Sequence, residues 1–233
     1  MTVHLLVLLP SPLLGPAVWA PVADLLRSRG HKAAVPSLPP MIATPDDVIA
    51  GWLREIPADR DLLLVPHSNA GLYVAALAEA RSVRGIVFVD AGLPSAQTTT
   101  PTAPPAFRRF LGGLVDHEGL LPPWTQWWEP ADVAALLPDP MTRAAVEGDQ
   151  RRLPLSYFDA DVPSPPGWEA MPAAYLAFGD TYADERSSAK RRGWPVRTLP
   201  GEHLHVLADP EAVTDALLGL IGRIRGCESF PVD

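Results

Sequence analysis

The sequence predicts an α/β protein with a doubly wound, mostly parallel sheet of about six strands and an inserted helical cap. Short continuous apolar runs alternate with segments of helical periodicity from residue 3 to residue 90, and this alternation returns between residues 174 and 224. A proline-rich stretch with short helical pieces separates the two parts. Continuous apolar runs are typical of parallel strands buried on both faces, and their alternation with helices indicates βαβ units.

The first predicted strand and helix occupy residues 3–9 and 18–29. The apolar run of the strand ends at Pro10, and the apolar residues of the second segment recur at helical spacing. Gly30 follows this segment, and glycine suits the left-handed position that ends many helices. These signals predict one buried strand with a helix packed behind it.

A short strand at residues 33–35 and a second helix follow. The helix has a clear start at Thr44-Pro45-Asp46-Asp47, with a capping hydroxyl, a proline in the first turn and two acids near the helix N-terminus. We expect it to run to about Ile56.

The apolar strand at residues 62–65 leads into a polar triplet that contains Ser68, and a helical segment at residues 69–80 begins at once. A serine on a tight turn between a buried strand and a helix is typical of a nucleophile elbow, in which the hydroxyl stands clear of the sheet. The helix N-terminus behind it favours negative charge in front of the serine. Another buried strand follows at residues 85–89 and ends at Asp90.

The pattern breaks after this strand and resumes near residue 173. We expect a core of residues 1–90 and 173–227, a helical cap of residues 91–172, and a flexible tail of residues 228–233. The predicted helices of the cap are 107–115, 130–137 and 140–150, and the returning elements are a strand at 174–178, a helix at 183–192, a strand at 196–199 and a helix at 210–224.

Composition excludes several classes of function. The net charge of −8 and the pI of about 5.2 disfavour a nucleic-acid partner, which needs a basic face. Prolines interrupt the N-terminal apolar run far short of a membrane span, no signal-peptide pattern is present, and Cys227 has no partner for a disulfide. We therefore expect a cytoplasmic protein without a membrane partner. No metal-ligand spacing or cofactor motif is visible, and a small-molecule substrate is expected.

The order of these elements around Ser68 resembles the α/β-hydrolase superfamily over nearly the whole chain. The segment from Leu5 through Trp19, Leu25 and Gly30-His31 is similar to the small single-domain members, the methylesterase and hydroxynitrile-lyase-like enzymes. The elbow reads Pro66-His67-Ser68-Asn69-Ala70 where these proteins usually have G-x-S-x-G. The resemblance implies that Ser68 is the nucleophile.

A nucleophilic serine needs a base, and the resemblance places it in the loop after the last strand. Two histidines occupy that loop, His203 and His205. The spacing from His203 to Pro210 matches the family pattern, so His203 is the expected base. Residues two apart in an extended loop point to opposite sides, and His205 is expected at the wall of the pocket.

Two carboxylates compete to orient the imidazole. Most of the superfamily carries the acid three residues after the glycine that ends the strand at 174–178, where this chain has Tyr182, which is not anionic at neutral pH. Asp180 lies close to that position and is the reserve. Asp90 matches the acid position of polyketide-type thioesterases at the end of the strand after the elbow, and it is the preferred partner of His203.

The oxyanion hole of such enzymes takes one N–H from the residue after the nucleophile, here Asn69, and one from the loop after the first strand. An ungapped match puts the second donor on Pro12, which has no N–H, so Leu13 N–H or the Ser11 hydroxyl is expected to replace it. The aromatic cap implies an apolar pocket. The expected pocket residues are Trp124, Trp127, Trp128, His67 and His205.

These residues predict a serine hydrolase that cleaves an ester or thioester with an apolar acyl part. Two alternatives remain open. In the first, a lyase or cyclase uses the same pocket, with His203 moving protons and Ser68 only positioning the substrate. In the second, a ligand-binding protein retains the fold without turnover.

Overall fold

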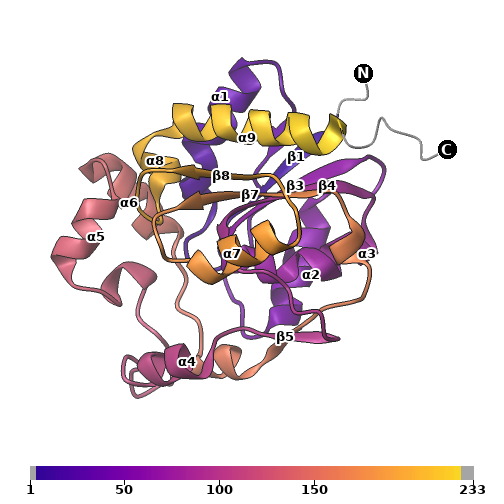
Figure 1. The fold of residues 1–233 in the computed structure, drawn as a ribbon. Coiled ribbons are helices and arrows are strands. Elements are labelled where there is room, and N and C mark those ends of the chain that lie inside the picture. The colour runs from indigo at the N-terminus through magenta and orange to yellow at the C-terminus, as the bar shows by residue number, and fades with distance from the viewer. Residues whose placement is uncertain (1–3, 227–233) are drawn as a thin grey trace.

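Six parallel strands form the centre of the protein in the computed structural model, which describes residues 4–226 (Figure 1). Their order across the sheet is β2-β1-β3-β4-β7-β8, and every neighbouring pair is parallel. The predicted fold class is therefore confirmed. The strands are β1 (Leu5–Leu9), β2 (Ala33–Ala34), β3 (Leu62–Ser68), β4 (Val83–Ala91), β7 (Ala173–Phe178) and β8 (Val196–Leu199).

Helices cover both faces of this sheet. Figure 1 shows α1 (Ala20–Ser28) and α9 (Pro210–Gly226) above the sheet, with α2 (Pro45–Glu55), α3 (Val74–Ala80) and α7 (Ala183–Arg191) below it. The α1 and α9 helices contact each other, and α9 also packs on β4, β7 and β8. The central strands β3 and β7 are buried along their whole length. This double burial explains the apolar sequence of β7 and of residues 62–65 in β3.

Local sequence signals explain the start of α2 and the end of α1. The Thr44 hydroxyl accepts a hydrogen bond from Asp47 N–H, and the Asp47 carboxylate accepts one from Thr44 N–H, which completes a capping box at α2. Gly30 has φ +83° after α1, as the prediction of a left-handed residue requires. The helix predicted at 18–29 begins instead as a 3-10 segment, η1 (Pro16–Trp19), before α1.

Residues 92–172 lie between β4 and β7. The three predicted helices are present as α4 (Pro105–Gly112), α5 (Pro130–Leu136) and α6 (Pro140–Asp149). A small antiparallel sheet of β5 (Thr99–Pro101) and β6 (Asp161–Pro163) joins the two ends of the segment and was not predicted. Strands of three residues that contain proline carry no periodicity that a sequence reading can detect.

One further helix was missed. The four-residue α8 (His205–Ala208) directly precedes α9, and its length is below that at which periodicity can be recognised. The first residue of the predicted strand 3–9, together with Cys227 and the predicted tail 228–233, lies outside the described residues. Within residues 4–226, no helix is long and apolar enough to cross a membrane.

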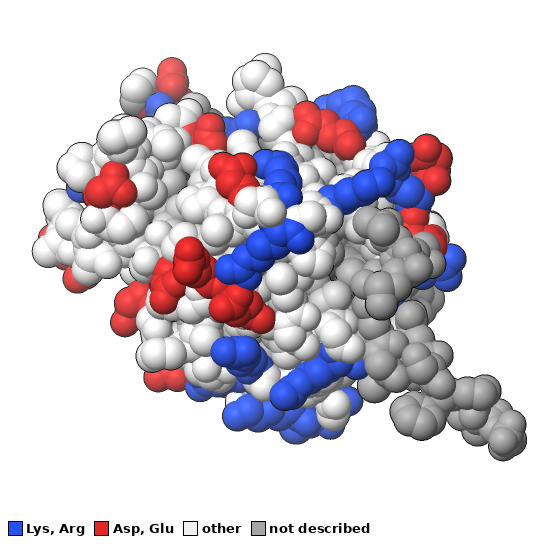
Figure 2. Space-filling view, turned by 90° about the horizontal axis from the view of Figure 1, so that it is seen from above, with Lys and Arg blue, Asp and Glu red and all other residues white. Residues whose placement is uncertain are grey.

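Acidic and basic side chains share the surface that is seen from above in Figure 2, the side on which α9 lies. Arg29, which follows α1, forms an ion pair with Asp215 of α9. With the net charge of −8, this distribution gives no broad basic face for a polyanion on the surface shown.

Candidate active site

The chain turns sharply at Ser68, between β3 and the 3-10 segment η2 (Asn69–Tyr73). Ser68 has φ 59° and ψ −132°, a backbone conformation that residues other than glycine rarely adopt. The turn is held by Gly92 N–H, which donates to Ser68 O at 3.1 Å. The strained turn predicted for a nucleophile elbow is therefore present, and it exposes 8% of Ser68 to solvent.

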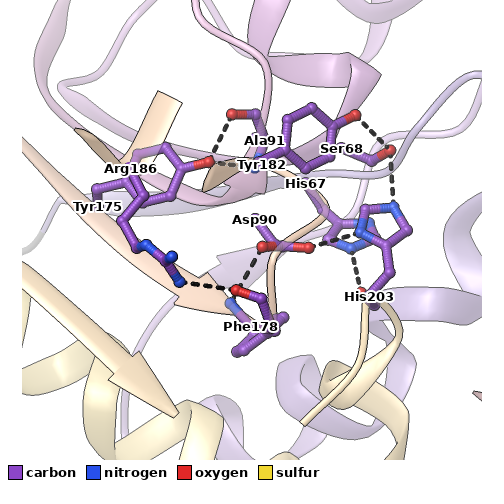
Figure 3. Close-up of polar contacts among 10 residues, drawn as sticks. His67, Ser68, Asp90, Ala91, Tyr175, Phe178, Tyr182, Arg186 and His203 are labelled. Atoms are coloured by element: carbon purple, nitrogen blue, oxygen red, sulfur yellow. Dashed lines mark hydrogen bonds and ion pairs between the residues drawn. The ribbon is translucent and has the colours of Figure 1, made fainter. Parts of the chain in front are cut away.

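Ser68, His203 and Asp90 form one hydrogen-bonded chain (Figure 3). His203 Nε2 lies 3.0 Å from Ser68 Oγ, and His203 Nδ1 lies 2.7 Å from Asp90 Oδ2. The three side chains come from the ends of β3 and β4 and from the loop after β8. Parallel strands bring their carboxyl ends to one edge of the sheet, which places these residues side by side.

Asp90 is buried, with 1% of its surface exposed, yet both of its oxygens are satisfied. Oδ2 accepts from His203, and Oδ1 accepts from Phe178 N–H at 3.0 Å. Its φ of +40° turns the strand end so that the carboxylate faces His203. The Tyr175 hydroxyl holds the next residue by donating to Ala91 O at 2.8 Å and accepting from Ala91 N–H at 3.0 Å. A buried carboxylate with these partners is suited to orient an imidazole.

His67 supports His203 from behind. Its Nε2–H donates to His203 O at 3.0 Å, and the two rings stack with centroids 4.6 Å apart. Complete burial, with a smaller contribution from neighbouring His203, holds the pKa of His67 well below its usual value. The neutral ring packs edge-on against Trp19. His67 therefore fixes the backbone and the ring plane of His203.

The two alternative candidates, Asp180 and His205, lie outside this hydrogen-bonded chain. Asp180 is exposed and pairs with Arg186 at 2.9 Å, so its carboxylate does not contact His203. His205 lies at the start of α8, with its ring edge-on to Phe178. Of the two candidate acids and two candidate bases, only Asp90 and His203 belong to the hydrogen-bonded chain that includes Ser68.

Tyr182 is the neighbour of Ser68 for which the sequence predicted no role. Its hydroxyl lies 3.3 Å from Ser68 Oγ, and its ring is 5.6 Å from the His203 ring (Figure 3). Burial raises the pKa of Tyr182 to about 12. No motif marks a tyrosine at this position, so the only signal in the sequence was the absence of an acid there.

The predicted oxyanion donors flank Ser68. Asn69 begins η2, so its N–H is one of the backbone donors that a helix start leaves without an intrahelical acceptor. Leu13 and Asn69 both line the cavity in front of Ser68. Leu13 N–H makes a long bond of 3.3 Å to the buried Ser11 hydroxyl. Ser11 is thus placed to hold the Leu13 loop, and it is absent from the described lining of the cavity.

A cavity of about 830 Å³ opens in front of Ser68 and His203. Its aromatic lining comprises Phe107, Trp124, Trp128, Phe158 and Tyr182, and its carboxylates are Asp132, Asp184, Glu185 and Glu202. Burial raises the pKa of Glu185, and neighbouring Asp184 raises it further. Neither lysine nor arginine occurs among the described lining residues.

Three residues expected in this lining are placed differently. Trp127 is turned inward, where its indole N–H donates to Pro122 O at 2.7 Å and its ring packs on Phe107 and Phe158. His67 is buried behind His203, and His205 faces Phe178. Trp124 and Trp128 do line the cavity. Adjacent residues of a helical turn point in different directions, which separates Trp127 from Trp128.

Within residues 4–226, no group of three or more histidine, cysteine, aspartate or glutamate side chains could hold a metal ion. The Ser68, His203 and Asp90 chain can perform proton transfer and nucleophilic attack with its own side chains.

No protein-family model matches the sequence, and no curated protein matches it significantly. Solved structures do match the fold. A variant of tomato methylketone synthase I in complex with β-ketoheptanoate has a TM-score of 0.76 at 16% identity, covering 96% of this chain and 99% of that one. An extracellular α/β-hydrolase from a Paenibacillus species has a TM-score of 0.70 at 16% identity, covering 93% and 98%. A pyrethroid hydrolase has a TM-score of 0.69 at 20% identity, covering 95% and 98%.

Proposed function

Because this chain has the α/β-hydrolase fold, we propose that it is a serine hydrolase that cleaves an ester or thioester with an apolar acyl part. The observation that carries the proposal is the hydrogen-bonded chain from Ser68 through His203 to buried Asp90, at the edge of a large aromatic cavity. A buried carboxylate, a histidine and a serine in this order are the components that activate a hydroxyl for acyl transfer.

In the proposed reaction, Ser68 Oγ attacks the carbonyl carbon of the substrate while His203 Nε2 takes the hydroxyl proton. Asp90 stabilises the imidazolium that forms and keeps Nδ1 as the protonated nitrogen. Asn69 N–H, with Leu13 N–H once it leaves the Ser11 hydroxyl, donates to the oxyanion. His203 then gives its proton to the departing alcohol or thiol. A water molecule then attacks the acyl-enzyme with the same help from His203, and the acid is released.

The cavity supports an uncharged, largely apolar substrate. Aromatic side chains of the 92–172 segment, such as Phe107 and Trp124, line the same cavity as Ser68. Such walls bury the apolar part of a ligand, which contributes about 25 cal/mol per Å² of apolar surface removed from water. We propose that the acyl group lies against these rings and that the 92–172 segment acts as the helical cap over the core.

A fluorophosphonate probe tests this function directly. We expect the purified chain to be labelled covalently on Ser68, because the probe reacts with serine hydroxyls that a base has activated. The Ser68→Ala variant should be folded and unlabelled, as judged by intact-mass spectrometry and circular dichroism. If folded wild-type protein remains unlabelled and hydrolyses no p-nitrophenyl ester, the hydrolase proposal is wrong and a non-hydrolytic use of the pocket, or ligand binding alone, is favoured.

The carboxylates of the cavity predict discrimination by charge. We expect kcat/KM for the p-nitrophenyl monoester of succinate, which is an anion, to be about three- to tenfold below that for p-nitrophenyl butyrate at low salt, because the carboxylates that line the cavity repel a like charge. The difference should shrink at about 0.5 M salt, where screening shortens the range of the interaction.

A pair of variants separates the effect of a carboxylate that lines the cavity from the effect of one that does not. Asp184→Asn should narrow the difference between the two esters, since Asp184 lines the cavity. Asp180→Asn is the matched control, because Asp180 is exposed, pairs with Arg186 and is not among the described lining residues. Equal rates for both esters in the wild type would contradict the proposed charge preference.

A further inference from the structure

We propose that Tyr182 is a further catalytic residue, whose hydroxyl donates a hydrogen bond to Ser68 Oγ and assists the departure of this oxygen when the acyl-enzyme is hydrolysed. The inference rests on the proposed hydrolase function. It assigns a chemical role to the residue that stands near the position from which the acid of most related enzymes would act.

The direction of the hydrogen bond follows from the protons available. An ionised carboxylate can only accept, so His203 Nδ1 must carry the proton that it shares with Asp90 Oδ2 at 2.7 Å. In the neutral ring, Nε2 is then an acceptor, and the Ser68 hydroxyl donates its proton to it at 3.0 Å. Ser68 Oγ has no second proton, so the contact of 3.3 Å with the Tyr182 hydroxyl requires the phenol to donate.

The surroundings keep this phenol protonated and in place. Tyr182 lines the cavity, and its ring packs against the ring of His203. With a pKa of about 12, the hydroxyl remains a donor at every pH at which a neutral histidine can act as a base. Tyr182 lies directly before α7 (Ala183–Arg191), which packs on β7 and β8 and fixes the loop that carries it.

A donor at this position affects the two halves of the reaction unequally. During acylation, Oγ starts as a hydroxyl that already accepts the hydrogen bond of the phenol, so this bond stabilises the ground state as well as the transition state and changes the rate little. In the acyl-enzyme, Oγ is an ester oxygen and a weaker acceptor. During deacylation, water adds to the acyl carbon and gives its proton to His203. The bond from carbon to Oγ then breaks, its electron pair moves to Oγ, and His203 returns the proton to this oxygen. The Tyr182 hydroxyl stabilises the negative charge that develops on Oγ in that step.

The test replaces Tyr182 by phenylalanine, which keeps the ring and removes only the hydroxyl. Rapid mixing of the full chain with p-nitrophenyl butyrate measures acylation as the initial burst and deacylation as the steady rate. We expect Tyr182→Phe to slow deacylation by about ten- to a hundredfold, the effect of one hydrogen bond to a charged oxygen. Acylation should change by less than about threefold, because the phenol donates to Oγ before the attack as well as during it.

Tyr157→Phe is the matched control. The Tyr157 side chain is fully buried, and its hydroxyl forms a hydrogen bond with the Tyr73 hydroxyl rather than with Ser68. This variant should lower stability, because it leaves the Tyr73 hydroxyl without its partner, and it should leave the ratio of acylation to deacylation unchanged. A merely structural contribution of Tyr182 would likewise lower both rates together.

The possible outcomes separate the two proposals. If wild-type protein is labelled by the fluorophosphonate and hydrolyses the ester, but Tyr182→Phe changes neither step or accelerates them, the role of Tyr182 is wrong while the hydrolase function stands. A rate increase would show that the phenol obstructs the nucleophile. If the wild type is neither labelled nor active, both proposals fail together.

Discussion

Replacement of Asp90 by asparagine is expected to lower kcat for a p-nitrophenyl ester by about 10⁴-fold, the loss typical of this change in a serine triad. The amide has nearly the shape of the carboxylate, so the hydrogen bond from Phe178 N–H at 3.0 Å can persist. However, an amide NH₂ facing His203 Nδ1 favours the wrong tautomer and removes the charge that would stabilise the imidazolium. Steady-state kinetics with an unfolding curve for the variant measure both effects.

Asp180→Asn is the control for Asp90→Asn, because it makes the same chemical change at the second carboxylate that the sequence analysis considered as the acid. Asp180 is exposed and pairs with Arg186, so its loss should change kcat by less than about twofold, as for other surface substitutions. If Asp180→Asn abolishes turnover and Asp90→Asn does not, the acid has been assigned to the wrong strand.

Gly71→Ala is expected to destabilise the fold by at least about 3 kcal/mol, a large effect for a single methyl group. A Cβ atom at Gly71 would lie 1.9 Å from Gly92 O, which is backbone and cannot rotate away. The chain would have to move at the end of β4, next to Asp90. Urea unfolding should therefore show a lower midpoint, and any folded fraction should react more slowly with the fluorophosphonate.

Gly148→Ala is the matched control for this substitution. Gly148 lies in α6, and an added Cβ would meet nothing within 4 Å. Alanine has the higher helix propensity, so this variant should be about 0.5–1 kcal/mol more stable. Equal stability of Gly71→Ala and the wild type would mean that the close approach of η2 and β4 is not required by the fold.

The sheet could be predicted from the sequence because its strands are buried on both faces. The strands β1 and β7 are apolar along most of their length, and β3 and β4 contain the apolar runs 62–65 and 85–89, as is typical of parallel strands covered on both faces. The three-residue β5 could not be predicted because its partner strand, β6, is distant in the sequence. The four-residue α8 could not be predicted because it is too short to show helical periodicity.

The candidate site could be predicted in part, for a related reason. Ser68 and Asp90 could be predicted because each comes at the end of an apolar run in the sequence, and the carboxyl ends of neighbouring parallel strands meet at one edge. The contact of Tyr182 with Ser68 depends on the direction of a side chain after a loop, and the inward turn of Trp127 depends on the packing of its neighbours. Neither direction is encoded in residue spacing.

The positions of Ser68 and Asp90 also bear on how the protein acquires its site during folding. Both residues belong to one strand–helix–strand unit, β3 through β4, whose two strands are hydrogen-bonded neighbours. Contacts that are close in sequence form with a smaller loss of chain entropy than distant ones. Two of the three residues of the proposed triad can thus come together within a single folding unit, and only His203 must arrive from the far end of the chain.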